Sequence, residues 1–554
     1  MIDPAIKHFL CELQQLASSE FIPCIGGRSE LPTQPGLKVK GRPISLPVAH
    51  EDLEWLCQEG CESPFGKGYD TVFDTDIRRS IEFEAEDLEI LNPSWEPELE
   101  KLTASISAQM AIDFQIKAEL FKLLVYREGG HFKFHQDTEK AQGMFASLIV
   151  QLPSRHRGGA LICRFAEQEF CFEFGHKKAD SEFNIYYAAH YADVQHQVEK
   201  VEEGARLVLV YNLIQPLTER QLSANLHEQI LETTQGMVPQ IFSSLEQEQH
   251  AFLLQHEYTE QSLSELGFSA VKGQDRSLVK ALLAVNDKLA LEHKLYFLIS
   301  RLSYSVTSQG CGYGNEYDNE YDDDDWEEID STSPSFDLCF DQEGHLLPIN
   351  DLGIDRIHDL NSQDINSFAF DTIDDHFWGE GDDEIEGFMG NYGPTKETTY
   401  ARYLLTIMPA YPSNADAFSN DIVLLAHRVL LMAQDLRLHP NCDWLKTRYN
   451  VALKQLLTQF NIEQQNQSTH QWNRYFNDKE LAIFTCLLKI AIASDEYELC
   501  QTAIETVSNR IAATLSSEVR AKEVLSLLIG AIEYFGWKKL SPLLNPVLNE
   551  LDGD

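Results

Sequence analysis

Short apolar or alternating runs follow one another at regular spacing between residues 115 and 215, and this feature constrains the fold most strongly. Glycine, proline, aspartate and serine bound the runs, which read HFKFHQD, MFASLIVQL, ALICRF, EFCFEF, FNIYYA and RLVLVYNL. Short strands at such spacing, separated by turn residues, are typical of a β-sandwich or a β-barrel. The sequence therefore predicts a β-rich core at 115–215.

The first of these runs carries two side chains that commonly bind metal ions. His135 and Asp137 stand two positions apart, and alternate side chains of a strand point to the same face. A second imidazole, His196, follows much later, at the end of an apolar run. Two histidines and one carboxylate form the facial triad of non-haem iron oxygenases, which leaves coordination positions open. We therefore predict that His135, Asp137 and His196 bind one metal ion and form the catalytic centre.

Two further residues could bind an anionic cosubstrate beside this metal site. Arg206 opens the run RLVLVYNL, and a planar guanidinium can pair with a carboxylate through two parallel hydrogen bonds. Tyr126 precedes His135 and could donate a hydrogen bond to the same carboxylate. Because Arg206 and Asn212 share one face of the predicted strand, the cosubstrate is expected along that inner wall.

Two other histidines compete with this interpretation. His50 and Asp52 repeat the same spacing, but they lie in VAHEDLEWL, where the acidic residues suit the first turn of a helix. His131 lies on the same face of the predicted strand as His135 and could be a further inward-pointing imidazole. We expect His131 to lie at the mouth of the strand instead, without binding the metal.

The order of these residues resembles that of the Fe(II)/2-oxoglutarate dioxygenases of the prolyl 4-hydroxylase type, as in a large multi-domain relative. The positions that carry the resemblance are, in chain order, Tyr126, His135, Asp137, the pair Gly158–Gly159 before ALICRF, His196 and Arg206. The resemblance implies an α+β chain whose core at 115–215 is a double-stranded β-helix, or jelly roll. It also implies Fe(II) at the three predicted ligands and 2-oxoglutarate at Arg206 and Tyr126, with ascorbate as a further reductant. Phe132 departs from the pattern, because some of these enzymes have a tyrosine three residues before the first histidine ligand.

The activity that the resemblance implies is hydroxylation of a substrate, with conversion of 2-oxoglutarate to succinate and carbon dioxide. The expected substrate is a polypeptide, with a prolyl residue as the hydroxylated position. Two alternatives stay open. One is an oxygenase that acts on a small molecule, and the other is a binding or scaffold protein whose acidic loops and C-terminal helices recruit a basic partner.

The charge balance narrows the classes of partner. The 554 residues include 88 acidic and 44 basic side chains, which give a formal net charge of −44. Such a chain repels phosphates and anionic lipid headgroups, so we predict neither a nucleic-acid partner nor a membrane. The eleven scattered cysteines and the start MIDPAIKHFLCELQQL, which lacks a signal-peptide pattern, predict a cytoplasmic protein with reduced thiols.

The length exceeds what one hydrophobic core can organise, so we expect several domains. The predicted divisions are 1–114 for a mixed N-terminal lead-in, 115–215 for the oxygenase core, 216–306 for a helical region, 307–412 for acidic loops with strands, and 413–554 for a helical domain. Apolar residues at helical spacing predict helices at 51–58, 97–114, 218–238 and 275–306, with five more after residue 420. These last five predict a bundle or an α-solenoid that could bind a protein partner. A short helix is also expected at 5–18.

Five stretches outside the core complete the prediction. From Glu316 to Asp330, ten of fifteen residues are acidic, and such blocks are typically solvated loops, which here could steer a basic polypeptide toward the protein. The run SFDLCFDQEGHLLPIN, before a second acidic stretch at 371–386, is expected to form a hairpin. The elements HEYT and KGQD extend the resemblance beyond the core, and we expect His256 within HEYT to be structural rather than to contact substrate.

Overall fold

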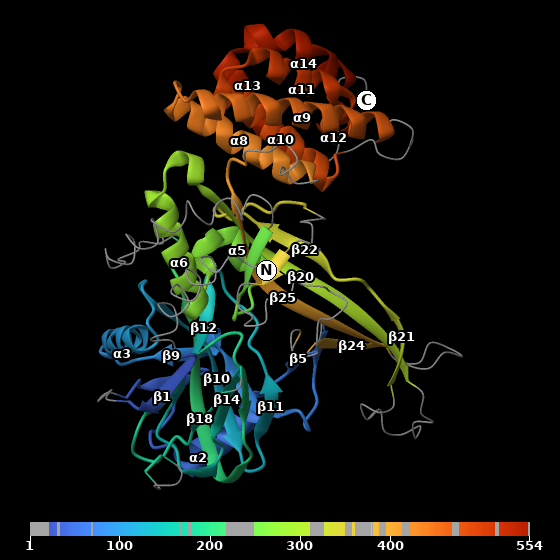
Figure 1. Cartoon of the computed structure of the whole chain (residues 1–554). Coiled ribbons are helices and arrows are strands. Elements are labelled where there is room, and N and C mark those ends of the chain that lie inside the picture. Colours follow the sequence, from blue (N-terminus) through green and yellow to red (C-terminus); the bar gives the residue numbers. More distant parts are fainter. Residues whose placement is uncertain are drawn as a thin grey trace.

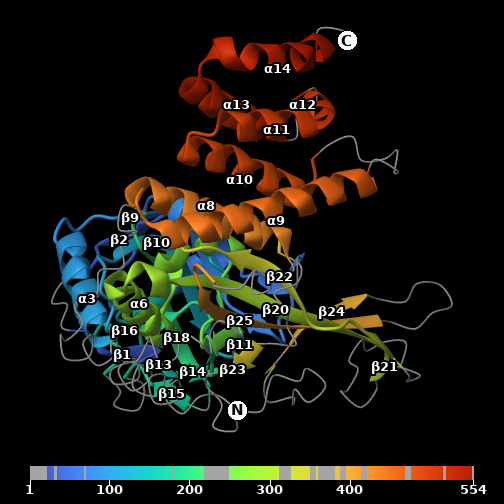
Figure 2. The same ribbon diagram turned by 45° about the horizontal axis from the view of Figure 1, so that its top comes forward.

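The computed structural model describes residues 22–29, 34–67, 70–166, 168–175, 180–217, 249–310, 326–349, 357–359, 378, 381–386, 395–412, 421–467, 476–515 and 520–551. These residues form a β-rich core up to residue 217, a second sheet with helices up to residue 412, and a helical part from residue 421 (Figure 1). The helical part extends away from the core in successive layers (Figure 2). The helices expected at 5–18 and 218–238, and residues 316–325 and 371–377 of the acidic stretches, lie outside the described residues.

Two antiparallel sheets make up the β-rich core. The larger sheet contains, in order, β1 (Cys24–Arg28), β16 (Tyr186–Tyr191), β12 (Met144–Gln151), β18 (Val201–Ile214), β10 (Lys117–Arg127), β8 (Ile81–Glu84) and β4 (Cys61–Glu62), with β13 (His156–Gly158) beside β18. The smaller sheet contains, in order, β15 (Gln168–Phe172), β14 (Leu161–Phe165), β17 (Gln195–Val198), β11 (His131–His135) and β7 (Arg78–Arg79). The predicted β-rich region and the α+β class with antiparallel sheets are therefore confirmed.

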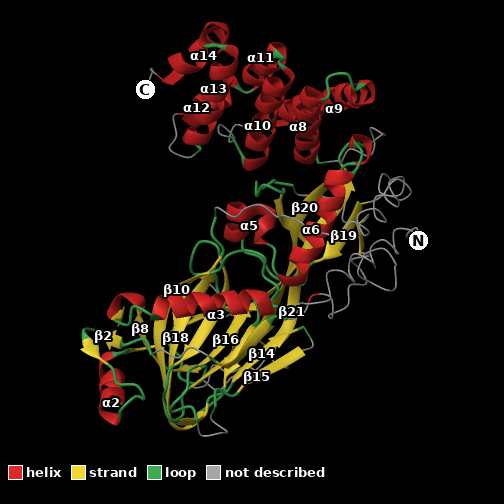
Figure 3. Cartoon of the chain, turned by 90° about the vertical axis from the view of Figure 1, so that its left-hand side faces the viewer, coloured by secondary structure: helices red, strands yellow, loops and turns green. Residues whose placement is uncertain are grey.

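Strand β12 shows why these runs form sheets. Every residue of MFASLIVQ is buried, so both faces of the strand are covered. On one face, Leu148 and Val150 belong to the same core cluster as Trp95 of helix α3 (Trp95–Gln109), which forms near the predicted 97–114. Helix α3 lies across this face of the sheet (Figure 3), and Trp95 Nε1 donates a hydrogen bond of 2.9 Å to the Tyr211 hydroxyl. The opposite face, toward the smaller sheet, carries the polar residues of the candidate site.

Short elements connect and flank the two sheets of the core. They are a small sheet of β2 (Leu37–Val39), β3 (Arg42–Pro43) and β9 (Leu88–Ile90), the pair β5 (Phe65–Lys67) and β6 (Asp70–Val72), and the 3-10 helix η1 (Ala85–Asp87). Helix α2 (His50–Glu59) forms where the sequence predicts a helix at 51–58.

The second sheet has seven strands among the described residues. They run in the order β21 (Trp326–Ser331), β20 (Leu295–Gly310), β25 (Thr395–Pro409), β19 (Gln249–Leu253) and β23 (Ile357–Asp359), with β22 (Ser335–Phe340) beside β20 and β24 (Asp382–Glu386) beside β25. The helical elements of this part are α5 (Glu260–Leu266), η3 (Gly267–Ala270), α6 (Gly273–Lys288) and η4 (Leu291–His293). After β22 the chain turns back, and Phe340 forms a single bridge with Leu346, so the expected hairpin has no regular second strand in the part of the chain described.

The helix predicted over 275–306 is wrong in its second half. Helix α6 ends at Lys288, and the chain from Leu295 onward is strand β20. On one face of β20, Phe297 and Ile299 pack with the helices α5 and α6, whereas Leu298 on the other face packs with the C-terminal helices. Because both faces are buried, apolar residues fill successive positions and no alternation marks the strand. A run of this kind cannot be distinguished from a buried helix by periodicity.

The C-terminal part is helical throughout its described residues, as the apolar spacing predicts. Its helices are α8 (Ile422–Leu438), α9 (Asp443–Gln467), α10 (Asp478–Ser494), α11 (Tyr497–Thr506), α12 (Ser508–Leu515), α13 (Ala521–Phe535) and α14 (Trp537–Leu551). Asn477 caps α10 in a capping box with Glu480, and Asp421 caps α8. None of the helices in the described part of the chain is both long and apolar enough to span a bilayer.

Candidate metal centre

The structure brings the three predicted metal ligands together. His135 is the last residue of β11, Asp137 lies in the loop that follows, and His196 lies on the neighbouring strand β17, where it is the register partner of His135. One ligand atom from each of the three side chains lies within 4.8 Å of the others. The distance from His196 Nε2 to Asp137 Oδ1 is 3.9 Å. Ligand atoms this close can converge on one divalent ion with small side-chain adjustments.

Backbone carbonyls orient both imidazoles. The Nδ1 atom of His135 lies 2.9 Å from the carbonyl oxygen of Lys133, and that of His196 lies 3.0 Å from the carbonyl oxygen of Val194. A carbonyl oxygen only accepts a hydrogen bond, so each Nδ1 carries the proton and each Nε2 presents a lone pair. This is the arrangement that outer hydrogen bonds commonly impose on metal-binding histidines.

The carboxylate of Asp137 is held by a neighbouring hydroxyl. Ser147 Oγ, on strand β12 of the larger sheet, donates a hydrogen bond of 2.5 Å to Asp137 Oδ2. The backbone N–H of Asp137 donates to the carbonyl oxygen of Ala192 (3.0 Å), in the loop that precedes His196. Asp137 is therefore held by a strand of the larger sheet and by the loop before β17, and its Oδ1 atom lies 3.9 Å from His196 Nε2.

The protonation states suit a divalent cation. Burial lowers the pKa of His135 and of His196 to about 4, against the opposing effect of the Asp137 charge. For Asp137, burial raises the pKa, but the adjacent imidazoles outweigh burial and lower it to about 2. Metal ligands must be deprotonated to bind. At neutral pH the cluster is therefore two neutral imidazoles and one carboxylate.

The other histidines named from the sequence lie apart from these ligand atoms. His131 has both ring nitrogens 3.0 Å from carbonyl oxygens, those of Gly129 and Asp76, which agrees with a place at the mouth of the strand. His50 begins helix α2, and Asp52 accepts hydrogen bonds from Ser45 and Arg42. The pair His50 and Asp52 therefore belongs to the start of helix α2 and not to a metal site.

Phe132 lies against the cluster. Its ring stacks on the His135 ring, with centroids 3.5 Å apart and an interplanar angle of 24°. The guanidinium of Arg78 also lies over the Phe132 ring, with its Cζ atom 4.5 Å from the ring centre. Phe132 thus supports the orientation of His135 by contact, without a hydroxyl of its own.

Arg206 is buried without an acidic partner among the described residues. Its exposed fraction is 1%, and burial lowers its pKa to about 10, so it remains charged at neutral pH. Its Nε atom donates to Gln151 Oε1 (3.1 Å), and its Nη1 atom has no hydrogen-bond partner. The rings of Phe174 and Tyr126 lie over the guanidinium at 4.3 and 5.7 Å. A buried charge without a countercharge is costly, and an anion that paired with this guanidinium would offset that cost.

Tyr126 and Arg206 occupy adjacent strands. They are register partners on β10 and β18, so the structure brings together the two residues predicted to bind a cosubstrate. Gly159 lies next to them with a backbone φ of +71°, and a Cβ atom there would lie 2.9 Å from Val201 and 3.4 Å from Arg206 Cδ. The glycine pair noted in the sequence therefore allows the close approach of the chain to the guanidinium.

Sequence reasoning missed three polar residues of the site: Ser147, Gln151 and His190. His190, on β16, is fully buried and is the register partner of Ser147, and its ring centroid lies 4.2 Å from that of His196. Its Nδ1 atom lies 3.0 Å from the Tyr191 carbonyl oxygen, and its Nε2 atom has no hydrogen-bond partner. Burial lowers its pKa to about 4. The available signal was a polar residue inside the otherwise apolar runs MFASLIVQL and YYAAHY.

Comparisons with known proteins give structural matches only. No family model and no curated protein matches the chain. Among the solved structures, 68 chains match. A prolyl-4-hydroxylase from Pseudomonas putida is 14% identical, and the match covers 38% of this chain and 100% of that one, with a TM-score of 0.24.

Two further matches are of the same kind. A 2OG-Fe(II) oxygenase family protein from Burkholderia pseudomallei is 13% identical, and the match covers 39% of this chain and 93% of that one, with a TM-score of 0.22. A prolyl hydroxylase from Trichoplax adhaerens, in complex with a fragment of the hypoxia inducible factor oxygen degradation domain, is 12% identical. That match covers 40% of this chain and 94% of that one, with a TM-score of 0.26. At such scores the function rests on the geometry of the site itself.

Proposed function

We propose that the chain is an Fe(II)- and 2-oxoglutarate-dependent dioxygenase whose two core sheets are the halves of a double-stranded β-helix. The observation that carries this proposal is the buried guanidinium of Arg206, which has no acidic partner among the described residues. Its partner Gln151 lies on strand β12, and Ser147 of the same strand holds Asp137 of the cluster of two histidines and one aspartate. A scaffold protein would gain nothing from an unpaired buried charge at this position. An enzyme that binds a dicarboxylate beside a metal ion requires one.

His135, Asp137 and His196 would hold the Fe(II). Three protein ligands leave other coordination positions open, as in the facial triad of non-haem iron oxygenases. Bound Fe(II) and 2-oxoglutarate supply the oxidative chemistry, in which one atom of dioxygen enters the substrate and the other enters succinate as carbon dioxide leaves. The protein positions these groups and keeps water out.

Arg206 would pair with the distal carboxylate of 2-oxoglutarate. Its free Nη1 atom provides a donor, and the hydroxyl of Tyr126 on the adjacent strand provides a second one. Gln151 accepts a hydrogen bond from the Nε atom of Arg206, which holds the guanidinium in one orientation. The ring of Phe174 covers the guanidinium and makes its surroundings apolar. Low polarity strengthens a charge-assisted pair of this kind.

For the substrate we propose a polypeptide, hydroxylated on a prolyl residue. The net charge of −44 supports a basic segment, because long-range attraction raises the rate of encounter. Hydroxylation of a small molecule remains the alternative outcome of the test below.

Anaerobic binding of 2-oxoglutarate in the presence of Mn(II) tests the cosubstrate site without any knowledge of the substrate. We expect wild type and His50→Ala to bind it, and His135→Ala and Arg206→Met to lose it. Release of succinate with Fe(II) then tests turnover. A mass gain of one oxygen atom on peptides or metabolites of a cell extract identifies the substrate class. Wild-type protein that binds Mn(II) but not 2-oxoglutarate would overturn the proposal.

A further inference from the structure

Two loops beside the metal ligands each contain a buried carboxylate. The loop of Asp137 is residues 136–143, and the loop of His196 is residues 192–194, which lead into His196 on strand β17. Glu139 follows Asp137 by two residues, and Asp193 precedes His196 by three. The side chains of Glu139 and Asp193 are only 9% and 7% exposed. The loops also contact each other, because Gln136 Nε2 donates to the Asp193 carbonyl oxygen (3.0 Å). Both carboxylates therefore need partners that the core itself does not supply.

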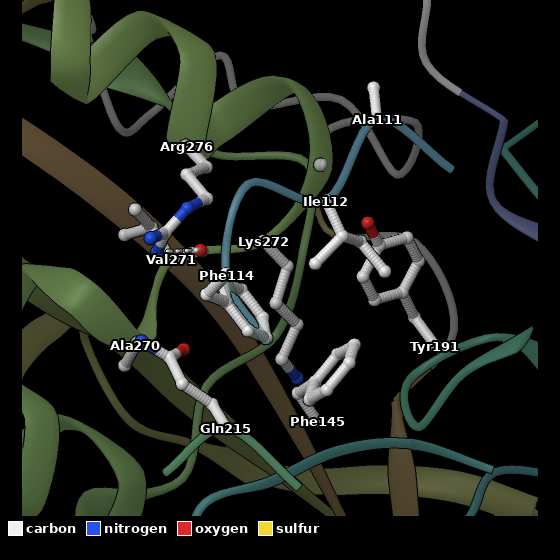
Figure 4. Close-up of a pocket in the computed structure, with 11 residues that line it drawn as sticks. Ala111, Ile112, Phe114, Phe145, Tyr191, Gln215, Ala270, Val271, Lys272 and Arg276 are labelled. Carbon is white, nitrogen blue, oxygen red and sulfur yellow. Dashed lines mark hydrogen bonds between the residues drawn. The ribbon is translucent and has the colours of Figure 1, made fainter. Parts of the chain in front are cut away.

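Lys272, from the second part of the chain, meets both carboxylates. It lies directly before helix α6, its side chain is 3% exposed, and it extends toward Phe145 of the core in the small pocket between the two parts (Figure 4). Its Nζ atom lies 3.3 Å from Glu139 Oε1 and 3.7 Å from Asp193 Oδ1. One ammonium group thus joins the loop of Asp137 to the loop of His196.

The segment HEYT adds one set of contacts to each loop. His256 Nδ1 lies 2.8 Å from Asp193 Oδ2, and the backbone N–H of Glu257 donates to the same oxygen (3.0 Å). Thr259 Oγ1 donates to Glu139 Oε2 (2.5 Å). Each loop is therefore held by Lys272 and by a separate part of HEYT.

Asp275 makes HEYT and KGQD one rigid unit. Its carboxylate accepts hydrogen bonds from the backbone N–H groups of Gln255 and His256, and from the Tyr258 hydroxyl (2.7 Å). Lys272 lies three residues before Asp275, at the same helix start. The partners of both ligand loops thus come from a single preorganised surface.

The charges of this contact are mutually compensated. Burial raises the pKa of Asp193, but His256 and Lys272 outweigh it and hold the pKa of that carboxyl well below its usual range. Burial lowers the pKa of Lys272, but the carboxylates of Asp193 and Glu139 outweigh it and raise that pKa. Removal of the ammonium would leave two buried carboxylates without a full countercharge, and the loops that bear them would have to move toward water.

We propose that Lys272 and His256 are positioning residues of the metal site: they hold the Asp137 and His196 loops in register from outside the β-rich core. The second part of the chain is then a component of the metal centre. The inference rests on the proposed function only in taking Asp137 and His196 as metal ligands. It assigns to HEYT and KGQD a role in ligand geometry, in addition to the structural role expected for His256.

The same interface offers a matched control. Asp113, which follows helix α3, pairs with Arg276 Nε (2.5 Å) and with Lys280 on α6. This second ion-pair cluster also joins the core to α6, but it contacts neither ligand loop. Lys280→Met therefore removes a lysine from the same interface without any direct effect on Glu139 or Asp193.

The experiment compares full-length wild type, Lys272→Met, Lys272→Arg, His256→Phe and Lys280→Met. Hydrogen exchange of the metal-free proteins is followed in peptides that cover 136–141 and 190–197. We expect Lys272→Met to speed exchange in both peptides, His256→Phe mainly in 190–197, and Lys280→Met in neither. Mn(II) affinity should fall about tenfold or more in Lys272→Met, recover partly in Lys272→Arg, and stay at the wild-type value in Lys280→Met.

Wild-type exchange in both peptides of folded Lys272→Met, or equal losses in Lys272→Met and Lys280→Met, would overturn the inference. Should Lys272→Met fail to fold, His256→Phe decides through its selective effect on 190–197. Absence of Mn(II) binding in wild type would instead defeat the proposed function, and the exchange data would still decide whether Lys272 holds the two loops.

Discussion

Ser147 and Gln151 point to the same face of strand β12, four positions apart, and each of them holds a different functional group. Ser147 donates to the carboxylate of Asp137, and Gln151 accepts from the guanidinium of Arg206. Four strand positions span about 13 Å. A single buried strand therefore sets the separation between the candidate metal ligands and the candidate anion site, and neither site can shift along the wall without the other.

Replacement of Arg206 should raise the melting temperature of the protein and lower its affinity for 2-oxoglutarate. Arg206→Met removes a buried charge that has no acidic partner in the described residues, so the apparent melting temperature should rise by about 2–4 °C for each kcal/mol of relieved desolvation. The same variant should lose 2-oxoglutarate affinity by tens- to thousands-fold, because a charge-assisted pair contributes about 2–5 kcal/mol. Thermal melts and anaerobic titrations measure the two effects.

Arg206→Lys provides the comparison for that experiment. A lysine keeps the charge but cannot present a planar fork to a carboxylate, so it should restore only part of the affinity. Unchanged binding of 2-oxoglutarate in Arg206→Met would remove Arg206 from the cosubstrate site.

Ser147→Ala should weaken metal binding without loss of a ligand. The hydroxyl fixes one oxygen of Asp137, and loss of such an outer hydrogen bond typically costs about 10- to 100-fold in metal affinity. Titration with Mn(II) measures the change, and Ser154→Ala, elsewhere in the core, serves as a control. An affinity equal to that of wild type would show that Asp137 is oriented by other contacts.

His190 and His196 should behave differently as metal-site residues. Their rings lie 4.2 Å apart, but only His196 belongs to the group whose ligand atoms converge. We expect His196→Ala to abolish Mn(II) binding and His190→Phe to retain it, since His190 contributes no atom to the group of ligand atoms that lie within 4.8 Å of one another. Strong Mn(II) binding in His196→Ala, with loss in His190→Phe, would reverse the assignment.

Asp193 should contribute stability above pH 4 and lose it in acid. Its pKa in the folded protein lies well below the value of about 3.9 for an unfolded aspartate, so below that value the unfolded chain takes up a proton first. Asp193→Asn should therefore melt at a lower temperature than wild type from pH 5 to pH 8, by an amount that reflects about 3–5 kcal/mol. The difference should shrink as the pH falls below about 4. A difference that grows in acid would contradict the assignment of a charged Asp193.

The candidate site was accessible to sequence reasoning because its members obey local rules. His135 and Asp137 come from adjacent parts of one short segment, and Arg206 opens the apolar run RLVLVYNL within strand β18. The site roles of these residues stay predictions until binding is measured. What the structure adds is their convergence, together with Ser147, Gln151 and His190, whose only signal in the sequence is a polar side chain within an apolar run.

Other features were beyond local rules. Strand β20 looks helical in sequence because both of its faces are buried, and its pairing with β21, β22 and β25 makes it a strand. Lys272 looks like an ordinary lysine before a helix, yet it is 3% exposed and faces two carboxylates from distant loops. Its role depends on how the second part of the chain packs against the core.

The sequence by itself determined the β-rich core, the flanking helices, and the residue types and order of the candidate metal and anion sites. These features follow from periodicity and side-chain chemistry, which act over a few neighbouring residues. Only the tertiary structure decided that β20 is a strand with both faces buried, which imidazole lies beside His196, and which lysine joins the two ligand loops. Such contacts join residues far apart along the chain, and their energies depend on burial that no single segment establishes alone.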